Sequence, residues 1–332
     1  MTGKNMKKKI SENLIHDGSE KGAVTEMTYG GLLREAEQYL EWCGIEENRT
    51  DAWYLFSDCF SMDRASYFLR AASAVPEEET EAAVRFRNLL EQRGSRIPLQ
   101  QILGVQEFMG LEFAVNGDVL IPRQDTEVLV EEILKDLIPE RKQDGAGDLA
   151  VLDLCTGSGC IGISLARYLA AYFTEGAGPS LQVVLSDISE KALRVAGENI
   201  RRLQCASWCS TVRSDLFEVF GQAGRLPARF DVIVSNPPYI PSGVIGTLAP
   251  EVKDHEPRLA LDGEADGLAF YRRIAAQAPD HLNPGGRLYV EIGWDQGEPV
   301  KKLFEAAQFA EVAVIRDLAG NDRVITSRNL NE

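Results

Sequence analysis

The sequence predicts an α/β protein, in which a seven-stranded, mostly parallel sheet is covered on both faces by helices and preceded by a small helical bundle and a hairpin linker. The main observation is that, from about residue 149 onward, short apolar runs typical of buried strands alternate with segments of helical periodicity. Residues 28–94, by contrast, carry apolar side chains at helical spacing. Between the two regions an Asn-Gly pair separates alternating apolar segments, which is typical of a hairpin turn.

The composition is that of a globular, acidic protein. Its 332 residues are 44% hydrophobic and 26% charged, and the formal net charge is −16. This charge disfavours a duplex-DNA partner, because phosphate contacts need Lys and Arg, but it is compatible with a basic protein partner. Six cysteines without a secretory signal predict a reduced, cytoplasmic setting, and no apolar run is long enough to span a bilayer. Cys205 and Cys209 have no partner pair of suitable spacing, so no metal site is expected.

Two segments precede the predicted linker. Residues 1–26 are polar and lack a sustained apolar period, so we expect a disordered or loosely ordered tail. Residues 27–97 predict a bundle of four or five short helices, with breaks at Gly44, at residues 61–63 and at Pro76. The bundle carries no recognisable chemistry, and its position in front of a larger domain is the only ground for the hypothesis that it recognises a substrate.

Residues 98–121 are predicted to form the hairpin linker, with its turn at Asn116-Gly117 because both central positions of that turn need a positive φ. Residues 122–332 would then form the α/β domain. A helix is expected soon after Pro122, with Asp125 or Thr126 placed to cap its amino-terminal end. Arg123 has no evident role in such a helix start.

Seven strands and, besides the helix after Pro122, four helices are expected within the α/β domain. The strands cover residues 150–154, 181–186, 207–212, 230–235, 286–292, 310–315 and 322–326, and the helices cover residues 161–172, 189–203, 268–281 and 298–308. The last two strands are close enough in sequence to form a hairpin, which would make one strand antiparallel. In a parallel sheet of this kind ligands bind beyond the carboxyl ends of the strands.

The most informative motif is Asn236-Pro237-Pro238-Tyr239, which directly follows the predicted strand at residues 230–235. Two prolines end the strand and stiffen the backbone, so the Asn236 amide, the Pro237 carbonyl and the Tyr239 ring are offered at fixed places. Such a set can hold a planar, nitrogen-bearing group. The motif resembles the Asn-Pro-Pro-Tyr of S-adenosylmethionine-dependent methyltransferases that act on amide or amino nitrogens.

A glycine-containing loop from Asp153 to Gly159 follows the first strand of the domain. Gly157 and Gly159 allow a tight turn and a close approach of the backbone to a ligand, and Thr156 lies between the strand and these glycines. The next strand ends at Asp187, whose carboxylate can accept two ribose hydroxyls. These residues fit NAD as well as S-adenosylmethionine, and the Asn-Pro-Pro-Tyr motif decides for the methyl donor.

Asp215, after the third strand, is placed to accept a hydrogen bond from the adenine amino group, with an ordinary helix cap as the alternative. The predicted donor-binding residues are therefore Asp153, Thr156, Gly157, Gly159, Asp187, Asp215 and Asn236.

Together these residues resemble the PrmC/HemK family over roughly residues 28–328. The resemblance is carried by the loop and the tetrapeptide, by Pro122-Arg123 with Thr126-Glu127, and by the segment from His255 to Gly263. It implies a Rossmann-like methyltransferase domain that methylates the side-chain amide of the glutamine in the Gly-Gly-Gln loop of class I peptide chain release factors. Gln101 and Asp125 depart from the family pattern, which has Tyr and Glu at these positions.

The resemblance implies a catalytic role for Asn236, Pro237 and Tyr239, and places the substrate against the whole tetrapeptide and Arg123. Arg123 and Arg258 are equally well read as members of structural ion pairs. The expected partner is a release factor bound by a cytoplasmic monomer, without direct contact to nucleic acid or membrane. Three alternatives remain: a glutamine methyltransferase of a ribosomal protein, an adenine amino-group DNA methyltransferase, and an inactive cofactor-binding scaffold.

Overall fold

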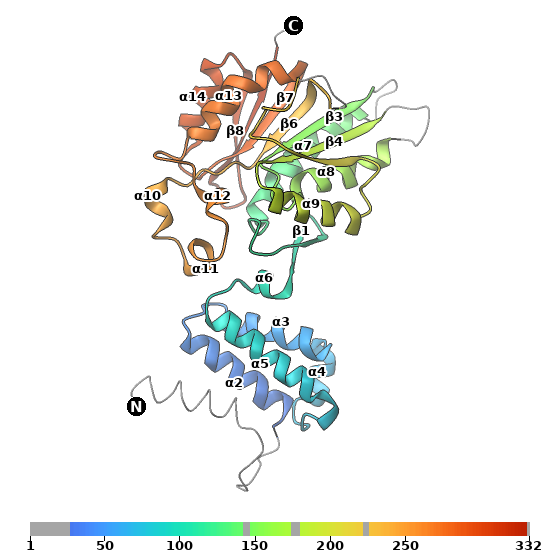
Figure 1. Cartoon of the computed structure of the whole chain (residues 1–332), viewed down its shortest axis with the longest axis vertical. Coiled ribbons are helices and arrows are strands. Elements are labelled where there is room, and N and C mark those ends of the chain that lie inside the picture. Colours follow the sequence, from blue (N-terminus) through green and yellow to red (C-terminus); the bar gives the residue numbers. More distant parts are fainter. Residues whose placement is uncertain (1–26, 142–146, 174–179, 222–225, 331–332) are drawn as a thin grey trace. The chain divides into compact units, whose positions relative to one another are not determined.

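A computed structural model describes residues 27–141, 147–173, 180–221 and 226–330. The chain divides into two compact units, with the division between Leu103 and Gly104. Figure 1 labels most of the helices and strands of the two units. The predicted tail, residues 1–26, lies outside the described residues.

The first unit is a helical bundle, as the apolar spacing predicts. Its elements are α2 (Tyr29–Trp42), α3 (Asn48–Phe60), α4 (Arg64–Arg70), the 3-10 turn η1 (Glu77–Glu79), α5 (Thr80–Gly94) and α6 (Leu99–Leu103). The Phe56 ring lies at the centre of its core, with ring centroids 4.7 to 6.2 Å from those of Tyr29, Phe60 and Phe86. Helix α6 packs its apolar residues into the same core, although the sequence predicts this segment to be part of the hairpin linker.

A β-hairpin opens the second unit, but its predicted turn is wrong. Strands β1 (Val105–Phe108) and β2 (Leu111–Ala114) pair antiparallel with Phe108 opposite Leu111. This register leaves Met109 and Gly110 as the turn, and both have the required positive φ, 51° and 66°. Asn116 lies beyond the hairpin, where its side chain accepts a hydrogen bond from the Asp118 backbone N–H at 2.8 Å. The Asn-Gly pair therefore makes a local turn stabilised by the Asn side chain.

The sheet has the order β5-β4-β3-β6-β7-β9-β8. Its strands are β3 (Leu149–Leu154), β4 (Leu181–Asp187), β5 (Cys209–Arg213), β6 (Phe230–Ser235), β7 (Leu282–Glu291), β8 (Ala310–Arg316) and β9 (Asp322–Arg328). Strands β3 to β7 pair in parallel, and β9 runs antiparallel to both β7 and β8. The expected hairpin of the last two strands, with one antiparallel strand, is confirmed.

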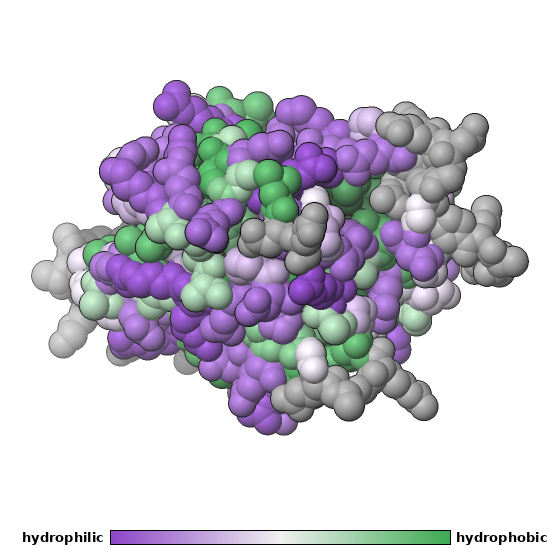
Figure 2. All heavy atoms as spheres, turned by 90° about the horizontal axis from the view of Figure 1, so that it is seen from above, coloured by the Kyte–Doolittle hydropathy of each residue, from purple (hydrophilic) through white to green (hydrophobic). Residues whose placement is uncertain are grey.

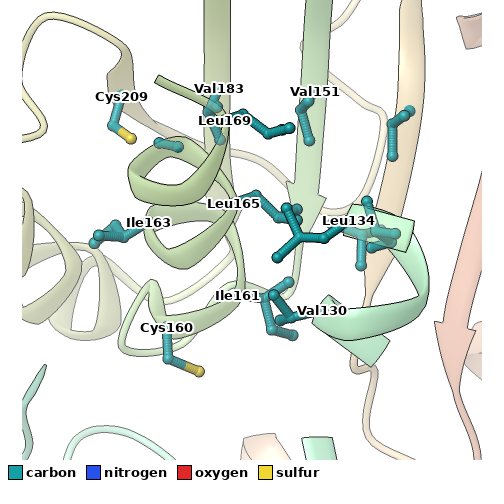
Figure 3. Packing of buried hydrophobic residues seen from close by; sticks show 14 of the residues in the cluster. Val130, Leu134, Val151, Cys160, Ile161, Ile163, Leu165, Leu169, Val183 and Cys209 are labelled. Carbon is teal, nitrogen blue, oxygen red and sulfur yellow. The ribbon is translucent and has the colours of Figure 1, made fainter. Parts of the chain in front are cut away.

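Helices cover both faces of this sheet (Figure 1). On one face lie α7 (Glu127–Arg141), α8 (Cys160–Leu169) and α9 (Glu190–Arg202), and on the other lie α13 (Ala269–His281) and α14 (Gly297–Ala306). Figure 3 shows the first layer, where Val130 and Leu134 of α7 meet Ile161 and Leu165 of α8. The remaining elements are the 3-10 turns η2 (Gln124–Thr126) and η3 (Ala170–Tyr172) and the short helices α10 (Ser242–Ile245), α11 (Pro250–Lys253) and α12 (Arg258–Leu261).

The face of the molecule shown in Figure 2 is largely hydrophilic. Figure 2 shows hydrophilic residues over most of the face seen there, with hydrophobic residues in small groups between them. In the part of the chain that the structure describes, no helix has the length and apolar character needed to cross a membrane. The apolar side chains are concentrated instead in the helix–sheet layers and in the bundle core.

Candidate active site

A cavity of about 1130 Å³, its open mouth included, lies at the carboxyl ends of β3, β4, β5 and β6. This is the place where ligands bind in parallel sheets. Most residues singled out from the sequence line it: Arg123, Thr156, Gly157, Asp187, Asp215, Asn236 and Pro238. The others, which are Asp153, Gly159, Pro237 and Tyr239, are not among its lining residues.

The two glycines of the first loop have different roles. Gly157 has φ +55°, and a Cβ added there would meet no protein atom within 4 Å. It lines the cavity, so its missing side chain leaves room for a ligand against the backbone. Gly159 has φ +82° and precedes α8, and a Cβ there would lie 2.8 Å from the Ile163 side chain and 3.0 Å from that of Leu185. Gly159 is therefore required for the packing of α8 on the sheet.

Asp153 stabilises the same loop from beneath. Its Oδ2 accepts hydrogen bonds from the Thr156 hydroxyl at 2.6 Å and from the Gly162 backbone N–H at 3.0 Å. Burial raises the pKa of this carboxyl to about 7, while the two hydrogen bonds lower it. Because Asp153 is fully buried and does not line the cavity, it acts on a ligand through the loop conformation.

Asp187 lines the cavity at the end of β4. Its Oδ2 accepts from the Gly157 backbone N–H at 3.0 Å, and its Oδ1 accepts from the Ser189 backbone N–H at 2.8 Å. Burial raises the pKa of Asp187, and these backbone hydrogen bonds lower it. A carboxylate has about four acceptor sites, so Asp187 retains capacity for the two ribose hydroxyls.

Asp215 lies on the cavity wall together with Arg273 of α13. The Arg273 guanidinium donates to Asp215 Oδ1 at 2.8 Å, and both side chains are about 40% exposed. No sequence pattern singles out Arg273, because it is one of two arginines in an ordinary amphipathic helix and is 58 residues from its partner. Oδ2 of Asp215 remains available to accept from an adenine amino group.

The tetrapeptide that follows β6 is held by several contacts. Asn236 donates from Nδ2 to Thr126 Oγ1 at 3.4 Å. The Tyr239 hydroxyl donates to Glu291 Oε1 at 3.4 Å, and the Tyr239 carbonyl accepts from Gln296 Nε2 at 3.0 Å. Burial, followed by the negative charge of Glu291, raises the pKa of Tyr239. Tyr239 is thus anchored at its hydroxyl and at its carbonyl, and Asn236 lines the cavity.

Arg123 lines the cavity and forms an ion pair with the buried Glu256. Its guanidinium donates to both Glu256 oxygens at 2.7 Å, and Glu256 Oε1 also accepts from the Ile121 backbone N–H at 3.4 Å. Arg258 pairs with Asp262 at 3.0 Å within one helical turn. Both arginines are therefore members of ion pairs, and the Arg123 pair joins the start of the domain to the segment after β6.

Comparison with known proteins identifies the family. The PrmC N-terminal domain matches residues 31–104, and the methyltransferase small domain matches residues 125–249. The chain is 42% identical to the release factor glutamine methyltransferase of Geobacter sulfurreducens over 87% of this chain and 93% of that protein. It is 40% identical to that of Cereibacter sphaeroides over 91% of this chain and 99% of that protein. The chain belongs to the release factor glutamine methyltransferase family.

The chain is also similar to the solved structure of the release factor-specific protein-(glutamine-N5) methyltransferase from Alicyclobacillus acidocaldarius. The sequence identity is 31%, the match covers 66% of this chain and all of that one, and the TM-score is 0.36. The family assignment depends on the sequence identities over nearly the whole chain.

Members of this methyltransferase family use S-adenosylmethionine as the methyl donor, and the cavity fits it. The glycine at 157 leaves space beside the backbone, and Asp187 has free acceptor capacity on the same wall. The structure adds residues that sequence reasoning gave no role: Cys155, Ile188 and Phe270 line the cavity, as do Pro257, Leu259 and Ala260 of the segment that carries part of the family resemblance.

Among the described residues, no group of three or more His, Cys, Asp or Glu side chains is arranged to hold a metal ion.

Proposed function

We propose that this chain transfers a methyl group from S-adenosylmethionine to the side-chain amide nitrogen of the glutamine in the Gly-Gly-Gln loop of class I release factors. The observation that carries the proposal is the position of Asn236: its side chain lines the donor cavity at the end of β6, and the two prolines after it fix the backbone. The family assignment and the tetrapeptide Asn236 to Tyr239 support a planar carboxamide as the acceptor.

The main task of the protein is alignment, because an amide nitrogen is a weak nucleophile with its lone pair delocalised into the carbonyl. S-adenosylmethionine supplies an electrophilic methyl group. Oδ1 of Asn236 and the carbonyl of Pro237 each accept one N–H of the glutamine amide and hold its nitrogen in place. Positioning of this kind is worth about 7–11 kcal/mol in well-oriented reactions. The same acceptors favour the positive charge that develops on nitrogen, by roughly 3–4 kcal/mol per group.

The proton leaves the methylated nitrogen after transfer and passes to water, so no general base is needed before attack. Tyr239 is proposed to stack on the planar substrate amide, and its hydroxyl is held by Glu291. Asp187 and Asp215 are proposed to hold the ribose and adenine of the donor.

The helical bundle, residues 27–97, is proposed to recognise the protein substrate. Its helix α4 has no buried residue, and Phe68 and Leu69 on it are 75% and 87% exposed. Large apolar side chains exposed next to each other are typical of a protein-binding surface. A monomeric, cytoplasmic enzyme without direct contact to nucleic acid is part of the same proposal, and gel filtration with light scattering tests the monomer.

The proposal is tested by incubating the purified chain with methyl-labelled S-adenosylmethionine and one acceptor at a time. We expect label on a class I release factor and none on its variant with Ala in place of the Gly-Gly-Gln glutamine. Equal labelling of both release factors would contradict the proposed acceptor. Labelling of a ribosomal protein or of DNA, with the release factor left unlabelled, would favour the corresponding alternative instead.

A further inference from the structure

Gln296 holds the far end of the Asn-Pro-Pro-Tyr segment. It directly precedes α14 and is only 7% exposed. Its side-chain Nε2 donates to the Tyr239 carbonyl at 3.0 Å and to the Gly267 carbonyl at 3.3 Å, and its Oε1 accepts from the Gly293 backbone N–H at 2.9 Å. One buried side chain thus joins the tetrapeptide to the segment before α13 and to the residues that follow β7.

The chemistry of these partners fixes the Gln296 amide in one orientation. The two carbonyls need donors, which the amide nitrogen supplies with its two N–H groups, and the Gly293 N–H needs an acceptor, which is the amide oxygen. An amide turned by 180° would place its oxygen against both carbonyls and its N–H groups against the Gly293 N–H. The buried amide is therefore held firmly, because a movement away from these partners leaves polar atoms without hydrogen bonds.

Two glycines enclose the same Tyr239 carbonyl. Gly267 has φ +75°, and a Cβ added there would overlap the Tyr239 carbonyl oxygen and lie 2.7 Å from Gln296 Nε2. A Cβ at Gly263 would lie 2.8 Å from the Cα and from the carbonyl carbon of Tyr239. The missing side chains let the backbone pack against Tyr239, so that the Gln296 amide reaches the Tyr239 and Gly267 carbonyls together.

The residues on either side of the tetrapeptide are held as well. The Ile240 N–H donates to the Leu261 carbonyl at 3.0 Å, and the Ile240 carbonyl accepts from the Gly263 N–H at 2.8 Å. At the other end Ser235 belongs to β6, and its hydroxyl donates to the Leu154 carbonyl at 2.9 Å. The tetrapeptide is therefore a short span between two fixed points.

The fixed far end matters because proline restrains only φ. The rings of Pro237 and Pro238 leave rotation about ψ, so a segment held only at Ser235 could still turn its carbonyls. The hydrogen bond from Gln296 to the Tyr239 carbonyl removes this freedom. The direction of the Pro237 carbonyl and the place of the Tyr239 ring thus depend on Gln296.

We propose that Gln296 is a positioning residue for methyl transfer, which holds the tetrapeptide so that the Asn236 amide oxygen and the Pro237 carbonyl face the substrate carboxamide. The inference rests on the proposed function, since these two groups are the proposed acceptors. Gln296 does not line the cavity, so it acts on the substrate only through the tetrapeptide.

Gln296→Met tests the inference, because methionine has nearly the length of glutamine and no amide. A misplacement of about 1 Å can cost about 100-fold in rate, so we expect kcat at saturating donor and release factor to fall by roughly this factor. KM for the release factor and the calorimetric Kd for S-adenosylmethionine should stay within a few-fold of the wild type. A binding stoichiometry of one donor per chain shows that the variant is folded.

Gln296→Glu is the more conservative variant. It keeps an oxygen to accept from the Gly293 N–H, but a carboxylate has no donor for the Tyr239 and Gly267 carbonyls. It should lower kcat as Gln296→Met does, and it keeps the inference testable if Gln296→Met does not fold.

Asn329→Leu is the matched control. Asn329 is a second buried amide, 2% exposed, whose Nδ2 donates to the Pro279 carbonyl at 3.3 Å and to the Leu282 carbonyl at 3.5 Å. It lies beside the first residues of β7, whereas Ser235, before the tetrapeptide, is paired with Val290 near the last. Asn329→Leu should lower Tm, as Gln296→Met does, and retain wild-type kcat.

Hydrogen exchange measured by nuclear magnetic resonance gives a readout that does not depend on turnover. The Ile240 amide should exchange about tenfold faster or more in Gln296→Met, because the preceding residue has lost its anchor. The Thr156 amide, which donates to the Ser186 carbonyl at 3.0 Å in the glycine-containing loop, should exchange as in the wild type. In Asn329→Leu both amides should exchange at the wild-type rate.

Wild-type kcat in Gln296→Met or Gln296→Glu would overturn the inference, and so would unchanged exchange of the Ile240 amide in Gln296→Met. An equal loss of kcat in Asn329→Leu would also overturn it, because general destabilisation would then explain both losses. Failure of the proposed function is distinguishable, because the wild-type enzyme itself would then transfer no label to the release factor, while the exchange of Ile240 would still report on the anchor.

Discussion

Replacing Gly159 by alanine should destabilise the second unit, whereas the same change at Gly157 should mainly weaken donor binding. A non-glycine residue at a positive φ costs about 1–2 kcal/mol. At Gly159 the added Cβ would also lie 2.8 Å from the Ile163 side chain and 3.0 Å from that of Leu185. Overpacking of this kind costs about 1–3 kcal/mol, so the expected total is about 2–5 kcal/mol.

The assays are thermal unfolding and calorimetric binding of S-adenosylmethionine. With roughly 2–4 °C per kcal/mol for a domain of this size, Gly159→Ala should lower Tm by about 4–20 °C. Gly157→Ala has only the free-energy cost of a non-glycine residue at positive φ, because its Cβ meets no protein atom within 4 Å. It should therefore lower Tm by a few degrees. The added Cβ of Gly157→Ala enters space next to the cavity, so the Kd of this variant for S-adenosylmethionine should rise about tenfold or more.

Gly320→Ala is the control for backbone cost alone, since Gly320 has φ +87° and no atom within 4 Å of an added Cβ. It lies in the turn between β8 and β9 and does not line the cavity. We expect a Tm decrease like that of Gly157→Ala and an unchanged Kd. The reasoning would be refuted if Gly159→Ala lost no more stability than Gly320→Ala, or if Gly157→Ala bound the donor with wild-type affinity.

Three further predictions concern the acceptor site and the bundle. Asn236→Ala should abolish methyl transfer to the release factor while the calorimetric Kd for S-adenosylmethionine stays within a few-fold, and loss of donor binding would contradict its assignment to the acceptor. Exchange of Phe68 and Leu69 for Ser should raise KM for an intact release factor but not for a short glutamine peptide. The matched control is Leu318→Ser, a fully exposed leucine of the second unit, which should change neither value. Asp51→Ala should lower the free energy of unfolding by about 3–5 kcal/mol, because it removes the carboxylate that lies 2.6 Å from the buried Arg93 guanidinium. Urea denaturation measures this loss, and a loss below about 1 kcal/mol would show that the pair contributes little.

The regular elements of the second unit could be read from the sequence with small errors. The seven predicted strands and four predicted helices all occur, and most of their ends differ by only a few residues. Apolar periodicity is a local property that survives in the folded state, because each strand or helix buries the face that its own sequence defines. The largest change of a strand boundary is in β7, which begins at Leu282 where the sequence predicted residue 286. Asn283, Pro284 and two glycines occupy that stretch and hide the strand signal.

The hairpin turn shows where local patterns fail. Asn116-Gly117 is the stronger turn sequence, yet Met109-Gly110 makes the hairpin. The choice depends on burial: the register with Phe108 opposite Leu111 places Phe108 and Phe113 in the core, where their rings lie 6.1 Å apart. Cross-strand packing outweighs the intrinsic preference of a two-residue turn.

The sequence by itself determined the order of strands and helices and the residues at the strand ends, including the Asn-Pro-Pro-Tyr segment and the loop with Gly157. These features depend on neighbouring residues. Only the tertiary structure decided which residues from distant parts of the sequence form hydrogen bonds and ion pairs with one another around the cavity. Thr126 and Asn236 are 110 residues apart, and Arg123 is 133 residues from Glu256. Contacts over such separations arise from how the sheet and its connections pack, so no local sequence pattern specifies them.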